Sequence, residues 1–167
     1  MAMTTIERTV RARQLYFHDP SAPAATAVVP AVVVAVRWSG GRLLLVRRCD
    51  SGSWELPGGP IAVGESAVDA ALRHAAQAAG VRLLVTDLLG LFADPRLVQR
   101  SGGGEVSQLV AILFGARCVG GVPRGDGHET SDAAWIAVAD LPGLPMEPSS
   151  RAWVEQALAV GEPPCLG

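Results

Sequence analysis

The sequence predicts an α+β domain in which helices cover a mixed β-sheet, an α-β-α sandwich. Three observations predict this fold class. Several long apolar runs are rich in Val and Leu, one segment repeats its apolar residues at helical spacing, and 19 Gly and 12 Pro residues are interleaved with the apolar runs of the 167-residue chain. Apolar runs separated by turn residues indicate short folded elements rather than disorder. A chain of this length can bury about 70% of its unfolded surface, which is enough for one compact domain.

The first strands are predicted from a hairpin pattern. Residues 26–38 are mostly a run of Val and Ala that is broken by Pro30. The run is too β-branched for a helix and indicates a buried strand. Gly40 and Gly41 then supply the positive φ angles of a tight turn, so residues 42–47 are the expected hairpin partner. Residues 54–56 follow after a loop and end at a Pro-Gly-Gly break at positions 57–59.

A helix is predicted over residues 66–79, because its apolar residues recur three and four positions apart along one face. Ser66 and Asp69 resemble a capping box at its start, and Gly80 stands where a left-handed residue ends a helix. On the polar face, Asp69 and Arg73 have the spacing of an ion pair between adjacent turns.

The remaining apolar runs predict three more strands and a final helix. The strands are expected at 82–92, 106–117 and 133–139, and the helix at 149–160, capped by Ser149 or Ser150. Two long segments, 94–105 and 120–132, are expected to be loops. Long loops on a rigid scaffold commonly carry binding residues.

Charge and cysteine content exclude several classes of protein. With 14 basic and 16 acidic residues the net charge is −2, and no basic cluster predicts a nucleic-acid polymer as partner. The three cysteines, Cys49, Cys118 and Cys165, are odd in number and far apart, so a reducing cytoplasmic location fits better than a disulfide framework. The charged first residues argue against a signal peptide, and no apolar stretch is long enough to span a membrane.

The segment from Trp54 to Val81 resembles the box of the Nudix (MutT-like) hydrolase superfamily. That box reads Gly, five residues, Glu, seven residues, then Arg-Glu-apolar-x-Glu-Glu-x-Gly-apolar, and Gly59, Glu65, Arg73 and Gly80 occupy its positions here. The resemblance implies a Nudix fold with a loop-helix-loop beside a mixed sheet and a C-terminal helix. It divides the chain into an N-terminal extension at 1–25, a Nudix domain at 26–161 and a tail at 162–167. Within the extension, residues 16–23 resemble a leader found in some actinobacterial members.

The box departs from the family pattern at three positions. Where the family has helix glutamates, this chain has His74, Gln77 and Ala78. The resemblance implies that those carboxylates hold a divalent metal against a diphosphate, and Mg²⁺ prefers carboxylate, phosphate and water oxygens. One carboxylate about 4 Å from a unit charge is worth roughly 4 kcal/mol at an effective dielectric constant of 20, so the loss weakens metal binding by orders of magnitude. No metal is therefore expected at normal affinity, and Mg or Mn enters only if activity is retained.

The retained positions are mainly those that build the motif. In the family, Glu65 and Arg73 commonly hold the loop against the helix, Gly58 and Gly59 permit the turn, and Gly80 ends the helix. Glu65 is thus either a structural partner of Arg73 or a surviving metal ligand.

The other candidate site residues each have a second interpretation. Glu129, in a late acidic loop, is either a base or metal ligand or a solvated carboxylate. Glu105 is either directed at the ligand or an ordinary strand-start residue, and His74 is either a general base or a helix-surface histidine. Arg47 and Arg48 either bind phosphate oxygens or form an exposed strand end.

Three classes of function follow. The first is a binding module for a nucleoside-diphosphate-linked or similar phosphate-containing small molecule, with weak or absent Mg-dependent pyrophosphohydrolase activity. The second is an enzyme, either a slow hydrolase with a metal site made by Glu65, Glu105 and Glu129 or a catalyst of unrelated chemistry. The third is a homodimeric interaction protein.

Overall fold

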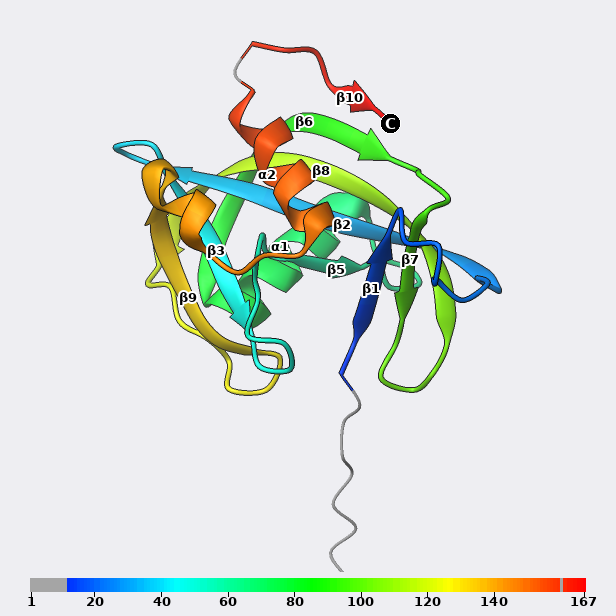
Figure 1. Cartoon of the computed structure of the whole chain (residues 1–167). Helices are drawn as coiled ribbons and strands as arrows, with labels where there is room; N and C mark the ends of the chain where they lie inside the picture. The colour runs from blue at the N-terminus through cyan, green and yellow to red at the C-terminus, as the bar shows by residue number, and fades with distance from the viewer. Residues whose placement is uncertain (1–11, 160) are drawn as a thin grey trace, which may run out of the picture.

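The computed structural model describes residues 12–159 and 161–167, so the first part of the predicted extension and Val160 lie outside the described residues. Its elements, in chain order, are β1 (Gln14–Phe17), β2 (Ala27–Trp38), β3 (Arg42–Arg48), β4 (Trp54–Glu55), β5 (Gly58–Pro60), α1 (Ala67–Ala79), β6 (Val81–Phe92), β7 (Leu97–Arg100), β8 (Val106–Gly121), β9 (Thr130–Ala137), the 3₁₀ helix η1 (Val138–Gly143), α2 (Pro148–Leu158) and β10 (Cys165–Leu166). Figure 1 shows a strongly curled sheet with α1 and α2 packed against it.

The centre of the sheet is the parallel pair of β2 and β8, which runs in register from Ala27 opposite Ser107 to Arg37 opposite Arg117. The far edge of β8 pairs antiparallel first with β7 and then with β6. On the other side, β2 pairs with β5 and, at its end, with β3, which in turn pairs with β4 and β9. The expected mixed sheet is therefore confirmed.

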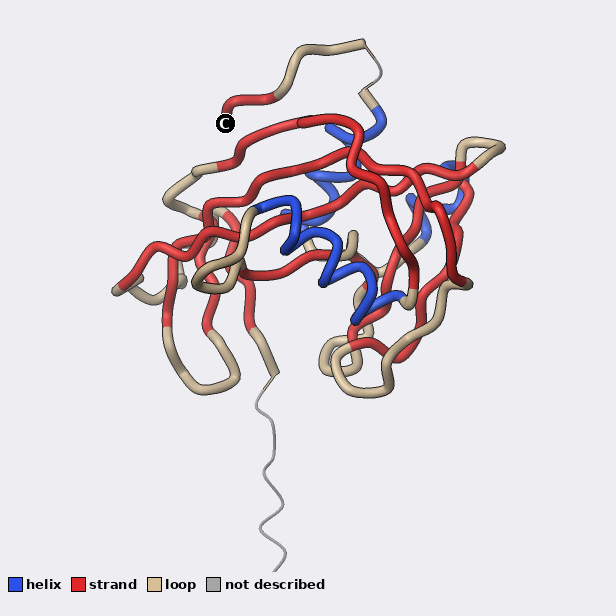
Figure 2. Tube along the Cα trace, turned by 180° about the vertical axis from the view of Figure 1, so that it is seen from behind, coloured by secondary structure: helices blue, strands red, loops and turns tan. Residues whose placement is uncertain are grey.

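Two cores lie on opposite faces of this sheet. One consists of Ala side chains of α1 packed on Val32, Val34 and Val36, and Figure 2 shows α1 crossing this face. The other places Trp153, Val154 and Ala157 of α2 on Val33 and Ala35. Alternate residues of β2 point to opposite faces, and because both faces are covered the strand is apolar throughout its buried part. The result is the predicted α/β/α sandwich.

The hairpin of β2 and β3 forms as predicted. Gly40 and Gly41 have φ angles of 79° and 73°, and Arg37 and Trp38 pair with Leu43 and Arg42 across the turn. The indole rings of Trp38 and Trp135 stack beside it, with ring centroids 5.1 Å apart. These contacts fix the position of β3, which carries two of the candidate site residues.

One predicted loop is wrong. Residues 94–105 contain β7, which pairs with β8 through Val98, Gln99 and Arg100 and with β1 on its other edge. The second predicted loop begins later than expected, because β8 continues to Gly121. Two-residue β10 in the predicted tail pairs with β6. Strands this short carry little sequence signal, because their pairing depends on neighbours far along the chain.

The predicted cap of the last helix is also wrong. The helix begins at Pro148, and its N-cap, Glu147, makes no side-chain capping hydrogen bond. The hydroxyl groups of Ser149 and Ser150 are instead buried within the first turn and find no hydrogen-bond partner among the described residues. None of the described helices is both long enough and apolar enough to cross a membrane.

Candidate functional site

The turn before α1 lies in close backbone contact with β2. Gly58 pairs with Val33 in the ladder of β5 and β2, and a Cβ atom on Gly58 would lie 2.2 Å from the carbonyl oxygen of Val32. Only glycine fits at that distance. The Pro-Gly-Gly break therefore marks the place where the loop of the box docks on the centre of the sheet.

Ser66 and Gly80 cap the two ends of α1, as predicted. The hydroxyl of Ser66 accepts a hydrogen bond from the backbone N–H of Asp69 and donates one to the Asp69 carboxylate at 2.8 Å. This carboxylate does not reach the Ser66 backbone, so the capping box is incomplete. At the other end Gly80 is left-handed, with φ of 70°.

Arg73 on α1 forms an ion pair with Glu65 in the preceding loop. Its Nε and Nη2 atoms donate to the two Glu65 carboxylate oxygens at 2.7 and 2.9 Å, and the backbone N–H of Ala62 donates to the same carboxylate at 3.0 Å. The Arg73 hydrogen bonds, with that of Ala62, lower the pKa of Glu65 to about 2. The expected pair of Asp69 and Arg73 is not formed, because the fork of Arg73 is taken up by Glu65 in a two-point contact.

His74 is packed into the box rather than exposed on the helix. The residue is 9% exposed, and Nε2 donates a hydrogen bond to the carbonyl oxygen of Pro60 at 2.8 Å. A Cβ atom on Gly59 would lie 2.3 Å from the Cε1 atom of this ring. The imidazole thus fills the space that a missing side chain leaves at Gly59 and ties α1 to the loop.

The other two altered box positions provide no carboxylate. Gln77 is exposed, and its amide oxygen accepts a hydrogen bond from Arg73 at 3.3 Å. Ala78 is buried, and its carbonyl oxygen accepts a hydrogen bond of 2.7 Å from the Thr130 hydroxyl. The last turn of α1 is therefore bonded to β9 through its backbone, at the position where the family pattern has an acid.

Thr130 is the end of a tight turn that carries Glu129. One carboxylate oxygen of Asp126 accepts hydrogen bonds from the backbone N–H groups of His128, Glu129 and Thr130 at 2.8, 2.9 and 3.0 Å. Burial raises the pKa of Asp126, but these hydrogen bonds outweigh burial and lower it. Asp126 is exposed, and its carboxylate holds this turn together; an Asp four residues before a strand-initiating Thr is the sequence signal for such a turn.

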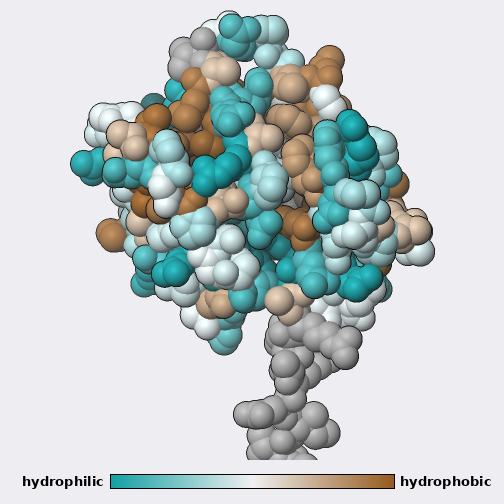
Figure 3. Space-filling model, in the orientation of Figure 1, coloured by the Kyte–Doolittle hydropathy of each residue, from teal (hydrophilic) through white to brown (hydrophobic). Residues whose placement is uncertain are grey.

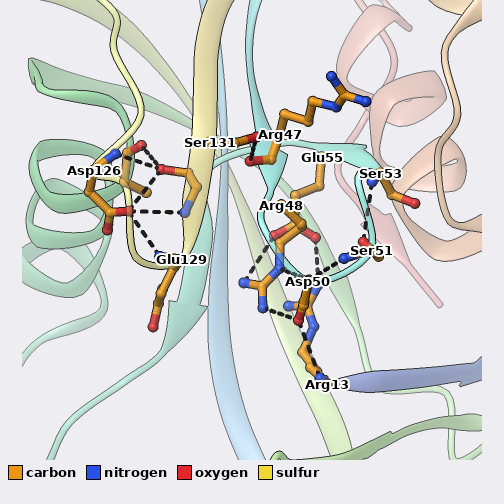
Figure 4. A network of polar contacts seen from close by, with 12 residues as sticks. Arg13, Arg47, Arg48, Asp50, Ser51, Ser53, Glu55, Asp126, Glu129 and Ser131 are labelled. Carbon is orange, nitrogen blue, oxygen red and sulfur yellow. Dashed lines mark hydrogen bonds and ion pairs between the residues drawn. The ribbon is translucent and has the colours of Figure 1, made fainter. Parts of the chain in front are cut away.

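Arg48 lies at the centre of a charged network on the β3–β4 turn (Figure 4). It donates two hydrogen bonds to Asp50, at 3.1 and 2.8 Å, and lies 3.8 Å from the Glu55 carboxylate. Arg13 pairs with Glu55 at 2.6 Å and also contacts Asp50 through its backbone. Burial raises the pKa of Asp50, but the Arg48 contacts lower it to about 2. No sequence pattern indicates that Arg13 reaches this network.

The structure brings together some of the predicted site residues and separates others. The backbone carbonyl of Glu129 accepts a hydrogen bond of 2.9 Å from the N–H of Cys49, the residue after Arg48. Thr130, which follows Glu129, is bonded to α1, the helix that carries Arg73 and its partner Glu65, so these groups share one region. The neighbouring residue Arg47 points away from Arg48 and Glu129 in Figure 4, as adjacent strand residues do.

Glu105 stands apart from this region as well. It lies in the turn between β7 and β8, where its backbone closes the turn against Ser101. Within residues 12–159 and 161–167, no three His, Cys, Asp or Glu side chains are grouped so that they could hold a metal ion.

A family model of the NUDIX domain matches residues 28–157. The chain belongs to the NUDIX family. Among its relatives, the MutT-like protein of Streptomyces ambofaciens is 31% identical over 126 residues, which are 73% of each chain. The putative 8-oxo-dGTP diphosphatase of Bacillus subtilis (strain 168) is 31% identical over 101 residues, or 60% of this chain and 61% of that protein.

Solved structures agree with this assignment. The MutT NUDIX hydrolase from Burkholderia pseudomallei is 27% identical with a TM-score of 0.62, covering 77% of this chain and 97% of that one. An ADP-ribose pyrophosphatase from Streptococcus suis 89-1591 is 19% identical with a TM-score of 0.63, covering 83% and 98%, and shows the fold alone.

NUDIX hydrolases generally use Mg or Mn, and the donors of this box do not fit such an ion. Position 74 presents an imidazole bonded to Pro60, position 77 a neutral amide and position 78 a methyl group. Glu65 is the carboxylate that remains in the box, and both its oxygens accept hydrogen bonds. A hard divalent ion requires several oxygen ligands in near-octahedral order, which this set does not provide.

Proposed function

We propose that this NUDIX-family chain binds a phosphate-containing small molecule, such as a nucleoside diphosphate derivative, with weak or absent Mg-dependent hydrolysis. The proposal rests on the side chains at the three altered positions of α1. These are a buried His, an exposed Gln and a buried Ala, while Glu65 forms an ion pair with Arg73. The box is thus complete as a folding unit and lacks the oxygens that would bind the ion.

The proposed ligand region lies around Arg48, Arg73 and Glu129. Guanidinium groups are well shaped to bind phosphate oxygens, and both arginines are held in place by carboxylates. Glu129 is exposed and is carried by the Asp126 turn, so its carboxylate is available to accept a hydrogen bond from a hydroxyl or amino group of the ligand. Ligand contact at these residues is part of the proposal.

A thermal-shift screen followed by turnover assays tests the proposal. The panel contains nucleoside diphosphate derivatives with and without Mg²⁺ or Mn²⁺, including 8-oxo-dGTP and ADP-ribose, which appear in the names of two of the similar proteins. A ligand that binds only the folded chain raises its melting temperature by mass action. We expect stabilisation by at least one compound and no metal-dependent release of product. Rapid metal-dependent cleavage would contradict the proposal.

A pair of neighbouring variants locates the binding region. Arg48→Gln removes the guanidinium that shares a region with Glu129, whereas Arg47→Gln removes one that points to the other side of β3. We expect the ligand-induced shift to fall in the first variant and to persist in the second. The reverse result would place the ligand on the opposite face of the sheet.

One observation favours a second candidate function, a hydrolase with a non-standard site. The turn that carries Glu129 is hydrogen-bonded to Cys49 after β3 and to Ala78 of α1, which supports a carboxylate beside the box. In that case Glu129→Gln abolishes turnover while the folded chain keeps its stability. The contribution of Glu105 that this site would need is not supported by its place in the β7–β8 turn.

A further inference from the structure

We propose that the free edge of β6 pairs with the same edge of a second copy of this chain. One edge of β6 is bonded to β8, whereas on the other edge β10 pairs with Gly90 and Leu91 alone. Residues 81–89 of this edge therefore have no strand partner within the described part of the chain. The pairing with β10 shows that the edge accepts a strand (Figure 1).

Exposed apolar side chains surround this edge. Leu84 and Leu88 of β6 are 45% and 52% exposed. Val119 and Val122, at the end of β8 beside the start of β6, are 55% and 79% exposed. In Figure 3 hydrophobic surface is visible over the upper part of the molecule, where β6 and α2 lie. A long apolar edge strand associates with other strands unless something covers it.

Three exposed residues in the first part of β6 project from the α2 face of the sheet. Leu83 and Val85 belong to the core under α1, so Arg82 and Leu84, which alternate with them, face the other way. Asp87 pairs with Gly115, and the neighbours of Gly115 along β8, Phe114 and Ala116, belong to the α1 core. Asp87 therefore shares the α2 face with Arg82 and Leu84.

The charges on this face have no ionic partners of their own. Neither Arg82 nor Asp87 forms an ion pair within residues 12–159 and 161–167, and Asp87 accepts a hydrogen bond from the adjacent Thr86 hydroxyl. Both residues are exposed. The guanidinium of Arg82 lies over Gly120 of β8, so it turns across β6 when it meets a partner of complementary charge.

A two-fold axis at Leu84 makes this edge complementary to itself. In an antiparallel pair centred there, Leu84 lies opposite Leu84 of the partner subunit, and Leu83 lies opposite Val85 of the partner subunit. The register of β6 shifts between Val85 and Asp87, which leaves Thr86 as an extra residue. Skipping this bulged residue brings Arg82 opposite Asp87 of the partner subunit, on the same face, and the two-fold axis produces this pair twice.

This match identifies the occupant as a second copy rather than a foreign strand. Two-fold interfaces present the same patch twice, so every favourable contact off the axis is doubled. Without the bulge, Arg82 would face Thr86 of the partner subunit and the charges would not meet. The side-chain faces, the bulge and the charges all agree with one alignment.

Sedimentation velocity over a concentration series tests the proposal on the whole chain. We expect a monomer–dimer equilibrium, in which Arg82→Asp or Asp87→Arg alone raises the dissociation constant about tenfold, because like charges then face each other in two places. Combining the two substitutions restores opposite charges and should return the constant towards the parent value. Asp140→Arg, the same change on the exposed surface of η1, is the matched control and should have no effect.

A second variant tests the axis directly. Leu84→Cys places two thiols opposite each other, so mild oxidation should give a disulfide-linked dimer far faster than in the parent chain. A parent that stays monomeric at all concentrations overturns the proposal. A dissociation constant that neither charge reversal changes also overturns it, as does one that the double reversal does not return towards the parent value.

Discussion

Substituting Gly59 by Ala tests whether His74 is a packed element of the box. The new methyl group would lie 2.3 Å from Cε1 of His74, 2.7 Å from Nε2 and 2.8 Å from Nδ1. Carbon atoms in ordinary contact are about 3.5–4.0 Å apart, so the ring must move by more than 1 Å. That movement breaks the 2.8 Å hydrogen bond between Nε2 and Pro60.

The expected cost follows from these two losses. Overpacking a well-packed site costs about 1–3 kcal/mol, and a lost hydrogen bond costs about 1 kcal/mol. Gly59→Ala should therefore lower the free energy of unfolding by about 2–4 kcal/mol. Urea unfolding followed by tryptophan fluorescence measures this change, with an unchanged m-value showing that the transition remains the same one.

The same substitution made beside His74→Ala isolates the contact. With the imidazole removed, the methyl group at Gly59 has room, and its cost should fall by about 1 kcal/mol or more, since residues in contact couple by about 0.5–3 kcal/mol. Gly143→Ala is the control, because no atom lies within 4 Å of the new methyl group. An equal cost of Gly59→Ala in both backgrounds would refute the packing of His74 against this turn.

Two further predictions concern the bonds that hold α1. Because the folded pKa of Glu65 is about 2 against an ordinary value of 4.5, its contribution is complete above about pH 4.5 and is lost as the pH falls towards 2. Glu65→Gln should flatten the stability–pH curve in that window, and an unchanged curve would contradict the ion pair with Arg73. Thr130→Val removes the hydroxyl that donates to Ala78 and should cost about 1–3 kcal/mol in urea unfolding, whereas Thr130→Ser should restore most of it.

The parts of the fold that follow from local chemistry could be predicted from the sequence. Gly40 and Gly41 indicated a hairpin because few other residues adopt positive φ, and Ser66 and Gly80 marked the two ends of α1. The two-residue error at the end of α2 has a similar origin, because Gly161 is a stop signal that the helix does not reach.

The parts that were missed depend on contacts between distant residues. β1 and β7 are four residues each and pair with each other, so neither has a signal without the other. The sequence offers two acidic partners for Arg73, Glu65 and Asp69, at plausible spacing. Only the fold shows that the loop places Glu65 against the guanidinium group. Arg13 reaches Glu55 over 42 positions of sequence.

Titration calorimetry of the parent chain with MgCl₂ and MnCl₂ tests the central claim most directly. The comparison is the variant His74→Glu/Gln77→Glu/Ala78→Glu, with its fold checked by circular dichroism. We expect no saturable binding to the parent and saturable binding to the variant, because the box folds without the oxygens that a divalent ion needs. Saturable binding of either ion to the parent, as tight as to the variant or tighter, would contradict the account.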